Sequence, residues 1–287
     1  MVYSLQGADG REASLWLLKL DGTESSPRPL VNEKSARATA PRWSPTGELI
    51  AYERRLLFEK EGFTQAQLWL VQPDGTPLPP LYGGSEKTGV YLNWTSGGDK
   101  AVFLDPRKEA VGIYNFSGEP EWLNLPGKKL ETLAISPDGR DMVLSRFDYS
   151  GSVEKVVLER WQHTSKDGWK ISPVQIENPA GFSNRLPVFS PDGRYLAFVR
   201  QDSKAGQLKS SQLWILDLSN GQTLSSGDGN GLTGSYQWTG TSGKIIMEQY
   251  PAGTRVNSLA GEIFELSVSS KSIVKLVSGG TMPGRVN

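Results

Sequence analysis

The sequence predicts an all-β fold, and three observations support this prediction. A polar turn preceded by an aromatic or apolar residue recurs along the 287 residues, apolar runs are only a few residues long, and no segment shows the periodicity of a helix. Hydrophobic residues make up 37% of the chain, which is enough for a sizeable core. The 32 glycines and 18 prolines supply the turns that many short strands require.

The recurring turn predicts a β-hairpin in each repeat. Two full copies read Ile135-Ser136-Pro137-Asp138-Gly139 and Phe189-Ser190-Pro191-Asp192-Gly193, and altered copies begin at Trp43, Trp94 and Trp238. Proline sets φ at the first central position, aspartate or glycine tolerates the next, and glycine supplies a positive φ before the return strand. The return strand is apolar on both faces, as in residues 195–198, so we expect it to be buried on both faces.

Two further strands follow each hairpin. An apolar strand comes next, at residues 15–18, 68–71, 113–116, 156–158, 213–216 and 263–266. A turn and a short final strand complete the unit, for example at residues 29–31 and 273–276. Each repeat is therefore predicted to be four antiparallel strands.

The spacing of the repeats predicts a β-propeller. The hairpin anchors at 43, 94, 135, 189 and 238 are about 49 residues apart, so residues 1–287 hold about six units in one domain. Four-stranded units with this period are typical of propeller blades. Residues 2–5 resemble the second strand of a hairpin, and residues 283–287 resemble the approach to one. We therefore expect six blades, with the ring closed by pairing of N- and C-terminal strands.

The Ser-Pro-Asp-Gly hairpin, its preceding aromatic residue, the apolar strand after it and the Leu-Trp element together resemble the WD40-like PD40 repeats of the TolB family. The resemblance extends over essentially the whole chain and implies a six-bladed propeller. In TolB the ring is the periplasmic part that docks other envelope proteins; the separate N-terminal domain of TolB has no counterpart in this sequence. The same repeat also builds propellers that gate prolyl-peptidase-type enzymes, and a group of metal-dependent uronide lyases.

Composition excludes several classes of function. The 31 basic residues balance the 31 acidic ones, which excludes a generally basic surface for nucleic acid. Cysteine is absent and His163 is the single histidine, so disulfides, thiol catalysis and sites with several His ligands are excluded, including the His-rich metal site of the uronide lyases. No apolar run approaches the ~20 residues of a membrane span, and the N-terminus does not read as a signal peptide. We expect no metal and no cofactor.

Catalytic motifs are weak. Gly-x-Ser-x-Gly and Walker A are absent, and a Ser-His-Asp triad would need His163, which reads as a surface residue in an outer turn. Residues 229–234 match G-x-G-x-x-G but precede a predicted strand, so we interpret them as a loop between blades. A pair of carboxylates could still serve a glycosidase, and sequence does not show their separation.

The candidate binding site is a set of arginines at one repeat position. Eleven residues after the anchors stand Arg54, Asp105, Arg146, Arg200 and Gln249. Asp148 and Asp202 follow two of the arginines, and Arg37 and Arg185 enter inner strands on the same face. Long, dissimilar loops at 53–66, 199–211 and 248–261 leave this face. The arginines either bind an anionic ligand or a protein loop, or pair with acids of neighbouring blades.

Six tryptophans occupy equivalent strand positions, which favours packing between blades over a sugar-stacking site. They are Trp16, Trp43, Trp69, Trp94, Trp214 and Trp238. Trp122, Trp161 and Trp169 fall outside the pattern, and we expect them to be exposed and available for contacts.

The sequence favours a non-catalytic protein-binding scaffold that presents one loop-rich face and a central channel to a protein partner. The TolB resemblance implies a periplasmic or other extracytoplasmic setting and an envelope partner; a cytoplasmic setting is the alternative. We expect a monomer that binds no nucleic acid. The alternative functions are a hydrolase or lyase acting on a glycan at the channel mouth, or the excised propeller of a larger enzyme.

Overall fold

The computed structural model describes residues 2–6, 11–17, 26–58, 62–81, 88–116, 118–125, 129–151, 154–172, 176–202, 210–227, 231–239, 242–251 and 262–278. Every regular element in these ranges is a β-strand, which confirms the predicted all-β class. The chain divides into two compact units, Met1–Gly127 and Lys128–Met282.

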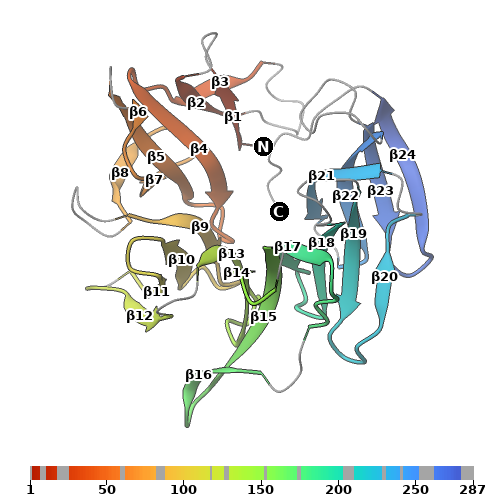
Figure 1. Cartoon of the computed structure of the whole chain (residues 1–287). Helices are drawn as coiled ribbons and strands as arrows, with labels where there is room; N and C mark the ends of the chain where they lie inside the picture. Colours follow the sequence, from red (N-terminus) through yellow and green to blue (C-terminus); the bar gives the residue numbers. More distant parts are fainter. Residues whose placement is uncertain are drawn as a thin grey trace. The chain divides into compact units, whose positions relative to one another are not determined.

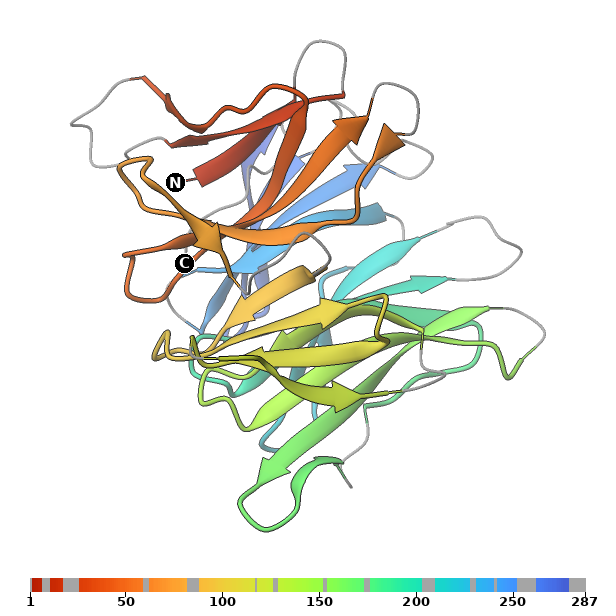
Figure 2. The ribbon, with the colours of Figure 1, turned by 90° about the vertical axis from the view of Figure 1, so that its left-hand side faces the viewer.

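The first unit contains an eight-stranded sheet and a four-stranded sheet, and the larger one consists of two antiparallel groups, β1–β3 and β4–β8 (Figures 1 and 2). Its strands are β1 (Val2–Gln6), β2 (Ala13–Leu17) and β3 (Arg28–Val31); β4 (Ala36–Trp43), β5 (Ile50–Phe58), β7 (Gln67–Val71) and β8 (Pro77–Pro80); and β9 (Val90–Trp94), β10 (Ala101–Asp105), β11 (Ala110–Tyr114) and β12 (Glu121–Asn124). A short strand, β6 (Gly62–Phe63), pairs with the end of β5. One parallel bridge, between Ala13 and Arg37, links β2 to β4. Figure 2 shows β9–β12 in yellow, running alongside one another.

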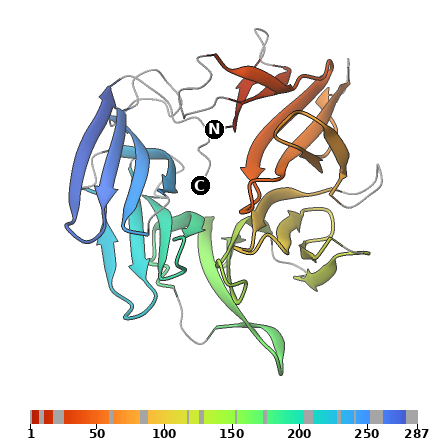
Figure 3. The ribbon, with the colours of Figure 1, turned by 180° about the vertical axis from the view of Figure 1, so that it is seen from behind.

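The second unit repeats the four-stranded pattern three times (Figures 1 and 3). Its strands are β13 (Leu130–Ile135), β14 (Asp141–Asp148), β15 (Lys155–Thr164) and β16 (Gly168–Ile171); β17 (Phe182–Phe189), β18 (Tyr195–Asp202), β19 (Ser211–Asp217) and β20 (Thr223–Ser225); and β21 (Gly231–Trp238), β22 (Lys244–Pro251), β23 (Glu262–Ser267) and β24 (Ser272–Ser278). Figure 3 shows β22–β24 side by side in blue.

The hairpins close as the sequence predicts. The Ser136 backbone N–H donates to the Asp141 carbonyl at 2.7 Å, and the Gly139 N–H donates to the Ser136 carbonyl at 2.9 Å. Gly139 has φ of 70°, which a residue with a side chain rarely adopts. The Ser136 hydroxyl donates to the Asp138 carboxylate at 2.6 Å and fixes the turn from inside. The same two backbone bonds recur in the hairpins that begin at Ser44, Thr95 and Ser190.

The core lies between successive sheets of each unit, and the second strand of a sheet contributes to two cores. In β5, Ile50 and Tyr52 pack with residues of β1–β3, whereas Ala51 packs with the sheet of β9–β12. In β18, Phe198 packs with β13–β16 and Ala197 packs with β21–β23. Alternate side chains of one strand therefore face different sheets, which confirms the expected burial on both faces.

The tryptophans largely follow the expected packing. Trp238 is buried, and Trp43, Trp69, Trp94 and Trp214 are partly buried against the core clusters. The expectation that Trp161 is exposed is wrong. Its side chain is 8% exposed and its indole N–H donates to Glu159, because β15 is long enough to carry Trp161 opposite the buried Met142.

Trp122 is also only half exposed, because its ring packs edge-on against Phe103 at 5.9 Å. Trp169 is half-buried and lies 5.3 Å from the ring of His163, in the outer hairpin of β15 and β16.

One expected loop and the two chain ends also bear on the sequence predictions. The expected loop at 53–66 is in large part strand, because β5 continues to Phe58 and pairs with β6. At the N-terminus β1 pairs with β2 as a second strand pairs with a third, with Val2 opposite Leu17. Residues 283–287, which were expected to close the ring, lie outside the described residues.

The last strand, β24, is apolar and exposed. Ile273, Val274 and Leu276 are each exposed over two fifths or more of their surface. Between them, Lys275 pairs with Glu262 of β23. Within the described residues no strand pairs with the outer edge of β24.

We expect Gly112→Ala to lower the free energy of unfolding by about 1–3 kcal/mol, as overpacking of a core does. A Cβ at Gly112 would lie 2.5 Å from the Phe103 ring, which is fully buried and cannot move aside. Gly243→Ala is the matched control, because nothing lies within 4 Å of the position its Cβ would take. Urea unfolding measures both changes; an equal loss in the two variants would contradict the packing described.

Candidate functional site

The three arginines at the shared repeat position lie in the same place in their respective sheets. Arg54, Arg146 and Arg200 stand in the second strands β5, β14 and β18. Each is paired in the sheet with a residue of the third strand: Arg54 with Gln67, Arg146 with Val157, and Arg200 with Gln212. The residue two positions further along that third strand is on the same face and within diagonal reach of the arginine. It is Trp69, Glu159 or Trp214.

The positive charge of Arg54 is compensated by the carboxylate of Glu33. Its Nε donates to Glu33 Oε2 at 2.7 Å and its Nη2 donates to the other oxygen of the same carboxylate. Its guanidinium also lies over the Trp69 ring, 4.7 Å from the centroid. The hydrogen bond with Glu33 raises the pKa of Arg54 above its ordinary value. This is a bidentate pair, in which the Glu33 carboxylate compensates the charge of Arg54.

The positive charge of Arg146 is compensated by Glu159 on the third strand of its own sheet. Its Nε donates to Glu159 Oε2 at 2.9 Å, and the other carboxylate oxygen accepts from the Trp161 indole N–H, also at 2.9 Å. Glu159 takes the position that a tryptophan holds in the other two sheets. An ion pair therefore replaces the cation–π contact in this repeat.

Arg200 is held by neutral groups alone. Its Nε donates to Asn184 Oδ1 at 2.9 Å and its Nη2 donates to the Glu177 backbone carbonyl at 3.1 Å. Its guanidinium lies 4.3 Å from the centroid of the Trp214 ring. Burial lowers the pKa of Arg200, and the more distant Glu177 carboxylate offsets this effect only in part. Arginine nevertheless stays protonated at neutral pH, so this side chain carries an uncompensated charge.

Arg185 also pairs with an acid. It donates to Glu131 on the inner strand of the preceding sheet, and to Gln201 at 3.3 Å. The interpretation of the arginines as structural ion pairs therefore describes Arg54, Arg146 and Arg185. Arg200 is the exception at the shared position.

The two predicted aspartates lie at strand ends. Asp148 pairs with Lys155 at 3.6 Å, and hydrogen bonds from the Ser150 hydroxyl and N–H lower its pKa. Asp202 ends β18, opposite Phe182, and its backbone N–H donates to Ser210. Asp148 and Asp202 therefore occupy corresponding ends of two sheets.

Exposed aromatic side chains lie beyond the arginines, at or just after the ends of the second strands, and the sequence analysis missed them. In the first unit Phe58 is 48% and Phe63 38% exposed, with the Arg37 guanidinium 5.1 Å from the Phe63 ring. In the second unit Tyr149 is 53% exposed, with Lys129 Nζ 5.1 Å from its ring. Their position in the sequence could have predicted their exposure, since each lies at or after the end of an apolar second strand.

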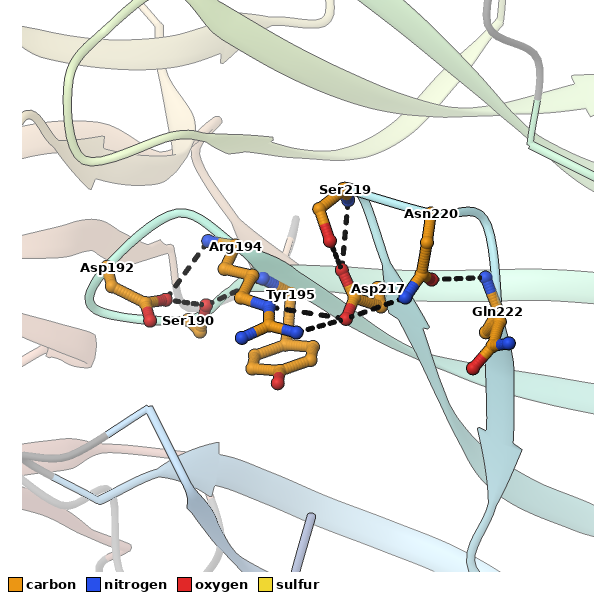
Figure 4. Close-up of polar contacts among 8 residues, drawn as sticks. All are labelled: Ser190, Asp192, Arg194, Tyr195, Asp217, Ser219, Asn220 and Gln222. Carbon is orange, nitrogen blue, oxygen red and sulfur yellow. Dashed lines mark hydrogen bonds and ion pairs between the residues drawn. The ribbon is translucent and has the colours of Figure 1, made fainter. Parts of the chain in front are cut away.

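The opposite end of the second unit carries a closed polar cluster (Figure 4). Arg194 Nη2 donates to Asp217 Oδ2 at 2.8 Å, and the Ser219 hydroxyl and N–H donate to Oδ1. The hydrogen bond from Arg194 is the main reason that the pKa of Asp217 is lowered to about 2. Because these groups satisfy one another, we interpret the cluster as an anchor for the turns around Gly193 and Gly221.

Other motifs from the sequence have structural roles. Gly231 and Gly234 lie in β21, while Gly229 and Asn230 lie outside the described residues. Gly234 leaves room for the buried Glu248, since a Cβ there would lie 2.7 Å from its carboxylate oxygen. In the described part of the chain, no three His, Cys, Asp or Glu side chains gather in a way that could hold a metal ion. The same residues contain no helix able to cross a membrane.

Comparison with known structures identifies the fold. Oligogalacturonate lyase in complex with manganese is similar over 99% of this chain and 73% of its own, with 12% identity and a TM-score of 0.62. A putative TolB from Agrobacterium tumefaciens is similar over 88% of this chain and 87% of its own, with 18% identity and a TM-score of 0.60. The fold is that of a β-propeller.

Hydrazine synthase from Kuenenia stuttgartiensis is also similar, over 90% of this chain and 69% of its own, with 12% identity and a TM-score of 0.57. Neither a protein-family model nor a curated protein matches the sequence. At these identities the likenesses describe the propeller fold alone.

We expect Asp217→Asn to reduce stability at neutral pH and to flatten its acid dependence. Asp217 has a lowered pKa in the folded state, so it stabilises the fold above the unfolded value of about 4, and this contribution is lost as the pH falls towards about 2. Urea unfolding between pH 7 and pH 2 measures the effect. Asp167→Asn, at an exposed turn, is the control and should keep the wild-type profile. Parallel profiles for wild type and Asp217→Asn would refute the assignment.

Proposed function

We propose that the protein is a non-catalytic scaffold that binds a partner protein at the strand ends beyond Arg54 and Arg146. One observation carries the proposal. Exposed aromatic side chains lie at the corresponding end of a second strand in both units. Phe63, beside Phe58 at the end of β5, is next to Arg37, and Tyr149 is next to Lys129. Aromatic residues and arginine are enriched in protein interfaces, where a few of them supply most of the binding energy.

We infer that this surface belongs to a single six-bladed propeller spanning residues 1–287. The support is the strand inventory. The described residues form two eight-stranded and two four-stranded sheets, and each eight-stranded sheet joins two antiparallel groups through one parallel bridge, β2 to β4 or β19 to β21. Without these bridges and the short β6, the strands form five groups of four and one group of three, β1–β3. In the group of three, β1 takes the second place, which leaves the first place for a C-terminal strand. A closed ring of this kind would bring the corresponding strand ends of all blades to one rim.

The setting is proposed from the TolB resemblance and the likeness to a putative TolB. It is extracytoplasmic, with an envelope-associated protein as partner and the propeller acting as a monomer without a cofactor. Loops and strand ends that vary from blade to blade on a rigid scaffold are where propellers usually acquire partners.

The proposal predicts that p-benzoylphenylalanine placed at Tyr149 or at Phe58 crosslinks the same protein in an extract of the native organism. The same probe at Val274 is the control, because Val274 is 54% exposed and therefore matches Tyr149 in accessibility. Mass spectrometry identifies the products. Crosslinks that are equally abundant from position 274, or unrelated products from the two test positions, would contradict the proposal.

Truncation tests the same surface in a second way. We expect Tyr149→Ser to weaken the crosslinked complex by about tenfold or more, as for an aromatic interface anchor, and Val274→Ser to leave it unchanged. Both side chains are exposed, so neither change should affect folding, which circular dichroism checks.

A second candidate is a lyase or hydrolase acting on a glycan, or the propeller of a larger enzyme. Its support is the likeness to oligogalacturonate lyase over 99% of the chain. Incubation of the protein with oligogalacturonate, with and without manganese, distinguishes the candidates. Release of shorter products would favour the enzyme over the scaffold.

A further inference from the structure

Arg200 differs from the other arginines of the candidate site in having no counter-ion. Arg54 and Arg146 occupy the same place in their sheets and pair with Glu33 and Glu159. In the described part of the chain, Arg200 makes no ion pair; its bonds go to an amide oxygen and a backbone carbonyl. For Arg54 and Arg200 alike, one partner comes from the segment that precedes the first strand of the sheet. The segment before β4 gives Arg54 the carboxylate of Glu33, whereas the segment before β17 gives Arg200 only the backbone carbonyl of Glu177.

The surroundings of Arg200 hold it rigidly. Trp214 lies against one face of the guanidinium and is itself packed on the core between the two sheets. Asn184, which accepts from Arg200, is 1% exposed, and its amide donates to the Glu177 carbonyl and to Asn178. Asn178 is fixed in turn by both backbone groups of Leu158. A partly buried network of hydrogen bonds, centred on the buried Asn184, therefore sets the direction in which the guanidinium points.

The geometry leaves an unused recognition surface on this guanidinium. A guanidinium has five N–H donors, and the described bonds use one on Nε and one on Nη2. Both donors of Nη1 and one of Nη2 have no partner among the described residues, and these form a fork that matches the two oxygens of a carboxylate. Arg54 keeps the same donors, so the missing counter-ion is what distinguishes Arg200. Fixing a partly buried charge without a counter-ion costs free energy, which an incoming anion would recover.

We propose that Arg200 binds the carboxylate of an acidic side chain on a partner protein. This rests on the proposed function and specifies the chemistry by which the partner is recognised. A carboxylate fits better than a phosphate, because a single arginine compensates the one charge of a carboxylate but not the two charges of a phosphate dianion. Asn184 and Trp214 are positioning residues, since they act through Arg200.

The experiment follows the arginine Nε–Hε signals of ¹⁵N-labelled protein during titration with N-acetylglutamate N-methylamide. We expect the Arg200 signal to shift and saturate, and the Arg54 signal to stay in place because Glu33 already compensates the charge of Arg54. The corresponding glutamine amide is the neutral control, and inorganic phosphate is the competing anion. The variants Arg200→Lys and Arg54→Lys assign the two signals.

Three results would overturn the proposal. They are an Arg200 signal that does not move, an equal response to the glutamine amide, and binding of inorganic phosphate as tight as that of the glutamate probe. The titration uses the unchanged protein, so it remains decisive even if a variant fails to fold.

The lysine variants add a quantitative comparison. Arg200→Lys keeps the charge but removes the fork, so we expect about tenfold weaker binding of the glutamate probe, in line with the loss of a charge-assisted hydrogen bond. Arg54→Lys should leave that binding unchanged, and an equal loss in both variants would also overturn the proposal. Crosslinking from Tyr149 reads partner binding independently, so failure of the carboxylate site and failure of the scaffold function give different patterns.

Discussion

The second strand of each sheet packs its two faces against two different sheets, and the rest of the molecule depends on this packing. Ile50 and Ala51 are neighbours in β5 yet belong to separate cores, and Leu196 and Ala197 in β18 repeat the arrangement. No sheet of this kind can bury its apolar residues alone, as in other repeat architectures. The strand ends, where this burial stops, are the positions at which the repeats are free to differ.

The shared arginine position illustrates how a repeat diverges while its frame stays constant. The backbone places Arg54, Arg146 and Arg200 alike, but each neighbourhood supplies a different partner: a bidentate carboxylate, a carboxylate that replaces a tryptophan, and a neutral amide with a carbonyl. The same residue type consequently has a structural role in two sheets and an unsatisfied charge in the third. The distinction lies in Glu33, Glu159 and Asn184, which are far from the arginines in sequence.

Local patterns predicted the fold well because its determinants are local. The Ser-Pro-Asp-Gly turns form the expected bonds, with positive φ at Gly139 and Gly193. The candidate site was only partly predictable. The spacing of the repeats predicted the position of Arg200. Its lack of a counter-ion depends on how the segment around Glu177 contacts β18, and the periodicity of the sequence does not predict that contact. Burial of Trp161 was missed for a related reason, since it follows from the length of β15.

The exposed edge of β24 has a consequence for how the protein behaves at high concentration. Its backbone groups and the side chains of Ile273, Val274 and Leu276 together form a surface onto which another strand could add. Lys275 stands in the middle of that surface, and a second strand laid over it would have to strip water from its ammonium group. Lys275 therefore disfavours the addition of a strand at this edge, as charged side chains on edge strands do.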